Sequence, residues 1–321
     1  MSIPPPRQPR FIQLHREDRE AVRGELAAGL LAPSAFVAPK YFYDPLGSRL
    51  FDAITELPEY YPTRTEAALL KKHESAMAAA LPKHTTLVDL GAGNCEKAAG
   101  LFGWLQPARY VAVDISVDFL RDSLHKLQRE HPALDMLGVG LDFSASLSLP
   151  PEVGEGERVL FYPGSSIGNF SPQDALRFLR QTRAAAQGGG LLIGVDLVKP
   201  VEILEPAYDD ALGVTAAFNK NLLLHINRLI GSDFAVQDWA HVAFFNSAES
   251  RIEMHLQATR DVAVNWPGAQ RHFKSGERIH TENSYKYTVP GFEQLLQSAG
   301  FAQTQVWQDA RGWFAMFWAR A

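Results

Sequence analysis

The 321-residue sequence has little of several features that mark particular classes of protein. Cys95 is its one cysteine, so no disulfide can form within the chain and a reducing compartment is expected. The net charge of −5 gives no basic excess of the kind that nucleic-acid-binding proteins show. Prolines near the start stand where a secretory signal would have an apolar run, and apolar stretches such as residues 191–198 are too short to span a bilayer. We therefore expect a cytoplasmic protein that binds neither nucleic acid nor membrane.

Apolar segments alternate with helical patterns through the middle of the chain. Strands are expected over residues 87–90, 110–116, 136–143, 159–163 and 191–198. Helices are expected from Thr63, which has capping-box spacing to Glu66, over residues 95–105 and 117–129, and after Ser171. Continuously apolar strands that alternate with helices form a parallel sheet covered on both faces.

The C-terminal part adds a helix over residues 292–300 and a hairpin of residues 303–308 and 313–319, whose last strand is antiparallel. The whole resembles the class I methyltransferase fold, an α/β, Rossmann-like, doubly wound and mostly parallel sheet with an antiparallel C-terminal hairpin. We assign residues 61–200 and 289–321 to this domain. Residues 201–288, with a long helix over about 201–230 and period-two strands, would form a smaller, inserted substrate-binding domain. Residues 1–60 would be an N-terminal extension that contributes to the substrate site.

A glycine-containing loop, Gly91-Ala92-Gly93, follows the first expected strand. Glycines let the backbone approach a ligand closely beside the next helix N-terminus, although many such turns bind nothing. The dinucleotide fingerprint G-x-G-x-x-G would need glycine at Glu96, so a nicotinamide dehydrogenase is disfavoured. Together with Asp89, the loop resembles the acidic-x-glycine-x-glycine signature of S-adenosylmethionine enzymes.

Further residues match an S-adenosylmethionine site. Asp114 ends the second strand, where a carboxylate can accept from both ribose hydroxyls. Asp142 and Phe143 end the third strand, where the carboxylate can accept from the adenine amino group and the ring can pack on the base. Lys97 can reach the cofactor carboxylate, although a surface lysine explains it nearly as well. Each aspartate alone would more often be a strand-end cap, but carboxylates at three successive strand ends favour a cofactor site.

Methyl transfer from a sulfonium needs little acid–base machinery, because the cofactor carries both the reactive carbon and the leaving group. Residues that recognise the acceptor are therefore the ones to look for. Specific motifs run from about Tyr41 to the C-terminus: YFYD with LGSRLFD, LPEYYPTRTE, LGAGNCEK, GSSIGNF, AYDDALGVTAAFNKN, RIEM and TENS. By these motifs the chain resembles the L-histidine Nα-methyltransferases of ergothioneine biosynthesis, which convert histidine into its trimethylbetaine, hercynine.

The resemblance implies three methyl transfers to the α-amine of L-histidine, through its mono- and dimethyl forms, with S-adenosyl-L-methionine as cofactor and S-adenosyl-L-homocysteine as product. It implies that Tyr60, Asn169 and Tyr208 hold the substrate carboxylate by neutral hydrogen bonds. The backbone around Gly164 and Ser166 would line the same pocket.

For the reacting end and the ring, the resemblance implies that Tyr43 faces both the amino group and the cofactor methyl, the catalytic position. Glu282 and Ser284 would bind the two imidazole nitrogens, and Met254 would pack beside the ring. Independently of the resemblance, the two-residue spacing places positions 282 and 284 on one face of a strand. Without the resemblance, Glu282 and Ser284 would more often be the wet face of an edge strand, and Met254 a core residue.

Other interpretations of the sequence remain. A related enzyme could methylate another amino acid, such as tryptophan or a methylated histidine. A non-catalytic S-adenosylmethionine-binding regulator would keep the Gly91 loop but lose the substrate residues. Cys95, at a helix N-terminus, is interpreted as a small filler without a catalytic role. We expect no metal and a monomeric enzyme.

Overall fold

The computed structural model describes residues 7–15, 18–115, 117–144 and 146–321, which fall into two compact units. The large unit comprises Met1–Arg16, Arg64–Leu197 and Tyr287–Ala321. The small unit comprises Glu17–Thr63 and Val198–Lys286. Each unit is therefore assembled from segments that are far apart in the sequence, and each is described below by itself.

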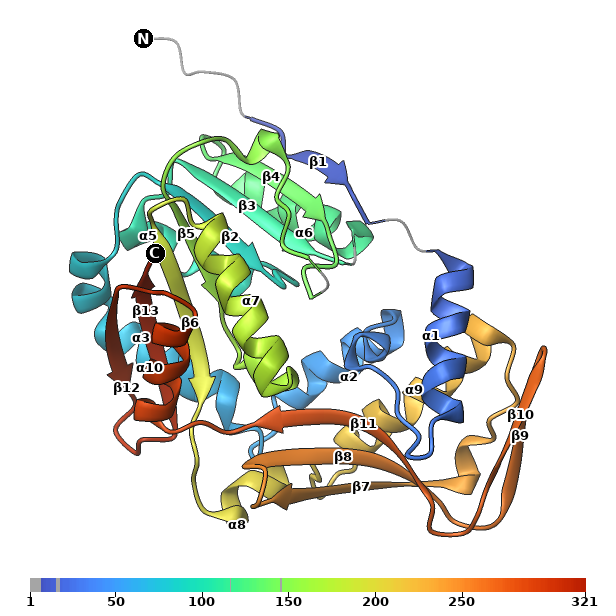
Figure 1. Cartoon of the computed structure of the whole chain (residues 1–321). Coiled ribbons are helices and arrows are strands. Elements are labelled where there is room, and N and C mark those ends of the chain that lie inside the picture. The colour runs from blue at the N-terminus through green and yellow to red at the C-terminus, as the bar shows by residue number, and fades with distance from the viewer. Residues whose placement is uncertain (1–6, 16–17, 116, 145) are drawn as a thin grey trace. The chain divides into compact units, whose positions relative to one another are not determined.

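The large unit alternates strands and helices over most of its length (Figure 1). Its elements are β1 (Arg10–Gln13), α3 (Tyr61–Ala80), β2 (Thr86–Leu90), α4 (Glu96–Ala99), α5 (Phe102–Leu105), β3 (Arg109–Asp114), α6 (Val117–Glu130), β4 (Asp135–Gly140), η2 (Pro151–Val153), β5 (Arg158–Tyr162), η3 (Ser166–Asn169), α7 (Pro172–Ala185), β6 (Gly190–Asp196), α10 (Val289–Ser298), β12 (Gln303–Gln308) and β13 (Phe314–Arg320).

Its strands form one eight-stranded sheet in the order β1-β4-β3-β2-β5-β6-β13-β12. All pairs from β1 to β6 are parallel, whereas β13 runs antiparallel to both β6 and β12. The order reverses direction at β2, and loops at the carboxyl ends of strands beside such a switch point are where ligands bind in open α/β sheets. This arrangement confirms the predicted class I methyltransferase fold.

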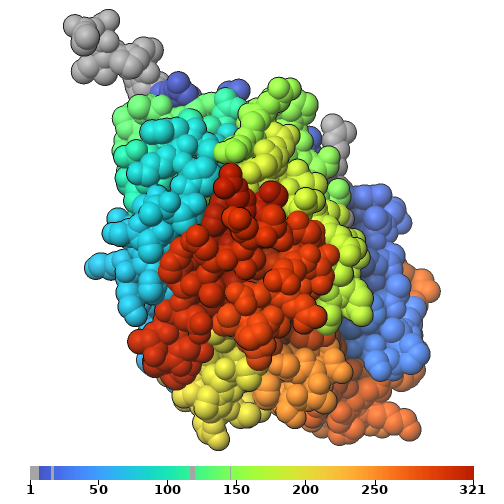
Figure 2. Space-filling view, turned by 60° about the vertical axis from the view of Figure 1, so that its left-hand side comes forward, coloured from blue at the N-terminus to red at the C-terminus, as the bar shows by residue number. Residues whose placement is uncertain are grey.

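Two apolar layers cover the faces of this sheet. On one face, Val111 and Val113 pack with Phe178 of α7 and Phe292 of α10 in one buried cluster. The alternate residues of the same strands point to the other face, where α3, α5 and α6 cover them. Figure 1 shows α7 and α10 on the near face, and Figure 2 shows the red C-terminal segment forming a broad, continuous part of this unit's surface. Burial on both faces explains why these strands are apolar throughout.

The small unit combines helices with antiparallel strands. Its elements are α1 (Arg19–Leu31), η1 (Pro39–Phe42), α2 (Pro45–Thr55), α8 (Val201–Leu204), η4 (Glu205–Ala207), α9 (Val214–Ile230), η5 (Val236–Asp238), β7 (Trp239–Asn246), β8 (Arg251–Ala258), β9 (Val262–Trp266), β10 (Ala269–Phe273) and β11 (Arg278–Tyr285).

A three-stranded antiparallel sheet, β11-β8-β7, forms the centre of the small unit, and β9 and β10 form a separate hairpin. Helix α9 packs against α1, α2, β7 and β8. The register of β11 against β8 shifts between His280 and Glu282, which is a β-bulge. Because a bulge changes which side chains face which way, Glu282 pairs with Met254, and both lie on the same face of the sheet.

Several predicted boundaries are wrong. Helix α3 begins at Tyr61, so Thr63 is inside the helix and forms no capping box with Glu66. The helix predicted over residues 95–105 is two short helices, α4 and α5, and the one over 201–230 is interrupted by residues 208–213, which form no helix. Strand β4 ends at Gly140, before Asp142, and the predicted end of the second strand at Ser116 lies outside the described residues. Among the described residues, no helix combines the length and apolar character needed to cross a membrane.

Strand β1 docks at the edge of the sheet, where the sequence pattern predicts no element. Gly138 of β4 pairs with Phe11 of β1, and an added Cβ at Gly138 would lie 2.7 Å from Phe11 Cδ1 and 2.9 Å from Leu124 Cδ1. A larger residue there would therefore push β1 and α6 away from the sheet.

We predict that Gly138→Ala lowers the free energy of unfolding by about 1–3 kcal/mol, measured by urea denaturation, because the packed site has no room for a methyl group. Gly103→Ala is the matched control, since an added Cβ there meets nothing within 4 Å. That change should be neutral or raise stability by up to about 1 kcal/mol. Equal losses in the two variants would contradict the close packing of β1 on β4.

Candidate active site

The loop after β2 exposes its backbone. Gly91 and Gly93 have φ angles of +71° and +51°, a conformation that favours glycine. The N–H groups of Gly91 and Ala92 donate to the Val113 carbonyl at 2.8 and 3.1 Å, which fixes the loop to β3. An added Cβ at Gly93 would meet nothing within 4 Å, and at Gly91 it would meet the Phe143 ring at 3.6 Å. A ligand can therefore approach the loop closely, which fits the predicted cofactor site.

Beneath the loop, Asp89 is buried and accepts a hydrogen bond from the Tyr110 hydroxyl at 2.8 Å. Burial raises the pKa of Asp89 to about 7, although the bond from Tyr110 opposes the rise. Burial likewise raises the pKa of the Cys95 thiol to about 12, the opposite of what a reactive cysteine needs. These groups support the loop from below, and Cys95 packs in the apolar cluster as a filler.

The predicted carboxylates beyond this loop make different contacts. Asp114 Oδ2 accepts from the Gly93 N–H at 3.0 Å, so it orders the loop directly. Asp142 Oδ1 accepts from the Ser144 N–H at 3.1 Å and the Ser144 hydroxyl at 2.5 Å, which is the local cap expected of an aspartate after a strand. The Phe143 ring lies beside Gly91 and packs edge-on to Tyr162, with ring centroids 5.9 Å apart.

A buried carboxylate that the sequence pattern does not reveal, Glu66, joins two of the predicted residues. Its Oε1 accepts from the Gly164 N–H at 2.8 Å, and its Oε2 pairs with Lys97 Nζ at 2.8 Å. Glu66 is 1% exposed. Lys97 therefore forms an ion pair with a buried group, while its own side chain stays exposed. The only sequence signal for Glu66 is its place in the TRTE motif, because its partners are far away in the chain.

The loop after β5 contains the other predicted residues of the large unit. Gly164 and Ser165 have positive φ angles of +76° and +58°, and the Ser165 hydroxyl accepts from the Asp196 N–H at 2.8 Å. Ser166 donates to the Pro163 carbonyl at 3.3 Å, and Asn169 ends the short helix η3, half-buried. This strained, tightly bonded loop fixes the backbone at the end of β5, beside the loop after β2, since β2 and β5 pair.

In the small unit, β11 and β8 bring three of the predicted acceptor residues together. Glu282 pairs with Met254 and Ser284 pairs with Ile252, so Glu282, Ser284 and Met254 share one face of the sheet. Glu282 is 8% exposed and Ser284 5% exposed. The interpretation of these residues as the wet face of an edge strand is therefore wrong, because both are buried.

A lysine that the sequence pattern does not single out, Lys286, lies among these residues. Lys286 Nζ donates to the Ser284 hydroxyl at 2.8 Å and to the Tyr208 hydroxyl at 2.9 Å, and these two hydroxyl oxygens are 2.7 Å apart. Its period-two spacing from Glu282 and Ser284 is the signal that could have found it. A buried ammonium requires such acceptors, so Lys286 belongs to the same polar cluster.

Burial raises the pKa of the Glu282 carboxyl to about 7, and the positive charge of Lys286 opposes the rise. Such a carboxyl exchanges a proton near neutral pH. Buried carboxyl groups with strongly shifted pKa values are frequent in functional sites, because their protonation state changes when a ligand binds.

Aromatic side chains form the rest of the predicted acceptor site in this unit. The Tyr60 and Tyr208 ring centroids lie 6.5 Å apart in an edge-on arrangement. Tyr43 packs edge-on against Phe51 and Phe218 at 5.7 and 5.9 Å, while remaining 39% exposed. Tyr43, Tyr60 and Tyr208 are thus joined through one aromatic cluster, since Phe51 also contacts Tyr60 at 6.1 Å.

Comparison with known proteins identifies the family. A family model described as histidine-specific, SAM-dependent methyltransferase matches residues 22–321. The chain belongs to this family. It is an S-adenosylmethionine-dependent methyltransferase.

Individual relatives agree with this assignment. The chain is similar to the histidine N-alpha-methyltransferases of Mycolicibacterium smegmatis (40% identical, 92% of this chain and 94% of that protein) and Mycobacterium tuberculosis (39% identical, with the same coverage). It is 30% identical to ergothioneine biosynthesis protein 1 of Neurospora crassa, over 83% of this chain and 31% of that longer protein.

The opposite face of the β11-β8-β7 sheet carries three possible metal ligands, Glu253, His255 and His280. One possible ligand atom of each lies within 4.8 Å of the others. Glu253 already accepts from Arg251, Asn246 and His255, and these bonds lower its pKa to about 2 although burial opposes them. Because Arg251 neutralises the one carboxylate, we interpret this cluster as a hydrogen-bonded network and not as a metal site.

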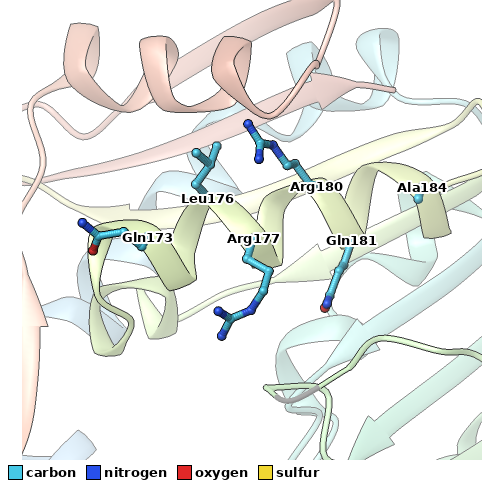
Figure 3. A pocket seen from close by; sticks show the side chains of 6 residues that line it. All are labelled: Gln173, Leu176, Arg177, Arg180, Gln181 and Ala184. Atoms are coloured by element: carbon cyan, nitrogen blue, oxygen red, sulfur yellow. The ribbon is translucent and has the colours of Figure 1, made fainter.

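A shallow hollow on the surface of this methyltransferase follows the outer side of α7 (Figure 3). Its lining residues are Gln173, Leu176, Arg177, Arg180, Gln181 and Ala184. The picture shows the long polar side chains spreading away from one another, so they do not converge on a ligand. None of the predicted site residues lines the hollow.

We predict that Glu66→Ala lowers the free energy of unfolding of the methyltransferase by about 1–3 kcal/mol, because the Gly164 N–H and Lys97 lose their buried partner. Glu66→Gln should cost less, since the amide oxygen can still accept from Gly164. Urea denaturation measures both. Glu74→Ala, at an exposed position of the same helix, is the control and should change stability by no more than about 0.5 kcal/mol. If Glu66→Ala behaved like this control, the assigned contacts would be wrong.

Proposed function

We propose that this enzyme transfers methyl groups from S-adenosylmethionine to the α-amine of L-histidine, three times, to give hercynine for ergothioneine biosynthesis. Membership of the histidine-specific family and the names of the most similar relatives support the proposal. The observation that carries it is the buried Glu282 carboxyl beside Ser284 and Met254. S-adenosylmethionine supplies a methyl group on a sulfonium and leaves as S-adenosylhomocysteine, so the protein has mainly to bind the acceptor, orient it and keep its amine unprotonated.

Glu282 and Ser284 suit an imidazole ring better than the side chain of phenylalanine or tryptophan. Imidazole has a nitrogen on each side of the ring, and each can take part in a hydrogen bond. A phenylalanine in the same place would leave the buried Glu282 without a partner, which costs far more than a poor apolar fit. Tryptophan offers one N–H and a larger ring, whereas Met254 is 2% exposed and closely packed. A different amino-acid acceptor is therefore disfavoured.

The other end of the substrate carries a carboxylate, and we propose that Tyr60, Asn169 and Tyr208 bind it by neutral hydrogen bonds. Gly164 and Ser166 would line the same pocket with backbone groups. Lys286 supports this role, because its ammonium beside the Tyr208 hydroxyl strengthens that hydroxyl as a donor.

Tyr43 is the residue that we propose to face both the substrate amine and the cofactor methyl. Its exposure and its edge-on contacts with Phe51 and Phe218 are consistent with a ring held firmly while one side stays open to a ligand. A nearby sulfonium lowers the pKa of the amine, so the amine can lose its proton to solvent before each transfer.

We propose cofactor contacts at the residues that the resemblance implies. The Gly91 and Gly93 backbone would meet S-adenosylmethionine at the loop, with Asp114 binding the ribose. Asp142 would accept from the adenine amino group with the oxygen that Ser144 does not use, and Phe143 would pack on the base. Lys97 would attract the cofactor carboxylate while paired with Glu66. The enzyme is proposed to act as a monomer in the cytoplasm.

The direct test is to incubate the purified enzyme with S-adenosylmethionine and each free amino acid, and to follow product masses. We expect mono-, di- and trimethylhistidine from histidine and no product from tryptophan or phenylalanine. No turnover of histidine, with turnover of another amino acid, would contradict the proposal.

The role of Glu282 has its own test. We predict that Glu282→Ala raises the KM for histidine by roughly 10- to 100-fold, because a buried hydrogen bond to a charged group is lost. The dissociation constant for S-adenosylmethionine should stay within about two-fold, since that site is formed by other residues. Glu249→Ala, an exposed glutamate of the same unit, is the control and should leave both values unchanged. Equal losses for histidine and cofactor in Glu282→Ala would count against an imidazole contact.

A further inference from the structure

Three buried polar groups of the small unit form a closed triangle of hydrogen bonds. Lys286 Nζ donates to the Tyr208 hydroxyl at 2.9 Å and to the Ser284 hydroxyl at 2.8 Å, and the two hydroxyl oxygens are 2.7 Å apart. Lys286 is 3% exposed, and its ammonium also lies 4.8 Å from the centre of the Tyr208 ring. Lysine can only donate, so the direction of two sides of the triangle is fixed.

The third side of the triangle, between the Tyr208 and Ser284 hydroxyls, makes the donor or acceptor role of one hydroxyl toward a ligand depend on that of the other. A hydroxyl has one proton to donate and two lone pairs to accept with. If Tyr208 donates outward, Ser284 must donate to Tyr208, and Ser284 keeps one lone pair with which to accept. If Ser284 donates outward, it accepts from both Lys286 and Tyr208 and has no lone pair left. The triangle thus allows two arrangements of its hydroxyl protons. A ligand that fixes the direction of the hydrogen bond at one hydroxyl therefore fixes it at the other.

We propose that Lys286 is a positioning residue that makes Ser284 a hydrogen-bond acceptor toward the imidazole ring of the substrate. The inference rests on the proposed function, in which Tyr208 donates to the carboxylate of histidine, a group that only accepts. One ring nitrogen must then carry a proton for Ser284. The other nitrogen and Glu282 share a second proton, either as imidazolium beside carboxylate or as neutral imidazole beside carboxylic acid.

The charges around Glu282 are compatible with a shared proton. Burial raises the pKa of Glu282 to about 7, close to the value of about 6.5 for free imidazole, so neither group holds the proton far more strongly. The charge that acts on Glu282 is that of Lys286, which follows β11, and the uncharged Met254 of β8 pairs with Glu282 in the sheet. Tyr208, from the segment after η4, bonds to Lys286. His241 of β7 bonds to the Tyr208 carbonyl at 2.8 Å, and burial lowers its pKa, so it stays neutral near pH 7.

Proton uptake on binding tests the hydrogen-bond direction. Calorimetric titration of the enzyme and S-adenosylhomocysteine with Nα-trimethylhistidine, in buffers of different ionisation enthalpy, counts the protons exchanged. This ligand has a quaternary nitrogen with no proton to lose. At about pH 8 both the free ring and Glu282 are mostly deprotonated, so we expect uptake of about one proton per ligand. Uptake near zero would mean that Ser284 donates to a bare ring nitrogen, and would overturn the inference.

Substitution tests the role of Lys286 itself. Lys286→Met should raise the KM for histidine by roughly 10- to 100-fold while the affinity for S-adenosylmethionine stays within about two-fold. Without the lysine charge the Glu282 pKa rises further, so the alkaline limb of kcat/KM should also move to higher pH. Lys286→Arg keeps donors and should recover part of the histidine affinity. An unchanged KM and pH profile, or equal losses for histidine and cofactor, would overturn the inference.

A matched control is Lys199→Met, which removes another buried lysine of the same unit, one that donates to the Tyr61 hydroxyl at 2.8 Å. Lys199→Met should leave the KM for histidine within about two-fold of the unsubstituted enzyme. If Lys286→Met fails to fold, Lys286→Arg and the proton count on the unsubstituted enzyme decide the question. Failure of the unsubstituted enzyme to methylate histidine would contradict the proposed function, and a normal histidine KM in Lys286→Met would contradict the Lys286 role alone.

Discussion

A carboxyl group that folding removes from water must be neutralised, paired or given to a ligand. In this methyltransferase we propose that Glu282 is such a group and that it binds the acceptor together with Ser284 and Met254. Lys286, which directly follows the strand of Glu282, supplies a compensating charge, and the same lysine donates to the hydroxyls of Ser284 and Tyr208. The bulge before Glu282 is what places these side chains on the Met254 face of the sheet. A local irregularity of one strand therefore determines which side chains can meet the acceptor.

The large unit follows a different constraint, which is backbone exposure. Its parallel strands are buried on both faces, so a ligand can meet them only at their ends, and the loop after β2 leaves space at its glycine Cα atoms. Positive φ angles at Gly91 and Gly93 achieve this, while Asp114 and the Val113 carbonyl hold the loop in place. Glu66 fixes the neighbouring loop after β5 through Gly164. Hydrogen bonds to partners distant in the sequence thus hold both of the loops that we propose to bind the cofactor and substrate.

Much of the large unit could be predicted, because burial on both faces leaves long apolar runs and glycine loops that are visible in the sequence. The antiparallel hairpin of β12 and β13 could be predicted as well. The serine cap of α7 could be predicted because Ser171 and Pro172 form a local signal for a helix start. Strand β1 was not, since its four residues carry no clear pattern and gain their place by pairing with β4. The capping box predicted at Thr63 was wrong, because Thr63 lies inside α3 and the Glu66 carboxylate bonds to Lys97 and to the Gly164 N–H.

The acceptor residues could be named only through resemblance to a family. Period-two spacing places Glu282 and Ser284 on one face, but it cannot tell a buried face from a wet one. Lys286 looks like a solvated lysine until the fold encloses it. Burial, bulges and long-range ion pairs arise from tertiary structure, so local sequence patterns contain little information about them.

We propose that the buried side chains of Glu282 and Ser284 form hydrogen bonds with both nitrogens of the imidazole ring of the substrate. Nitrogen NMR of ring-labelled histidine, bound to the enzyme with S-adenosylhomocysteine, tests it most directly. We predict that both ring nitrogens are hydrogen-bonded in the complex, with a proton on the one facing Ser284, and that Glu282→Gln changes the signal of the other. Two ring nitrogens with the signals of free histidine, unaffected by Glu282→Gln, would contradict it.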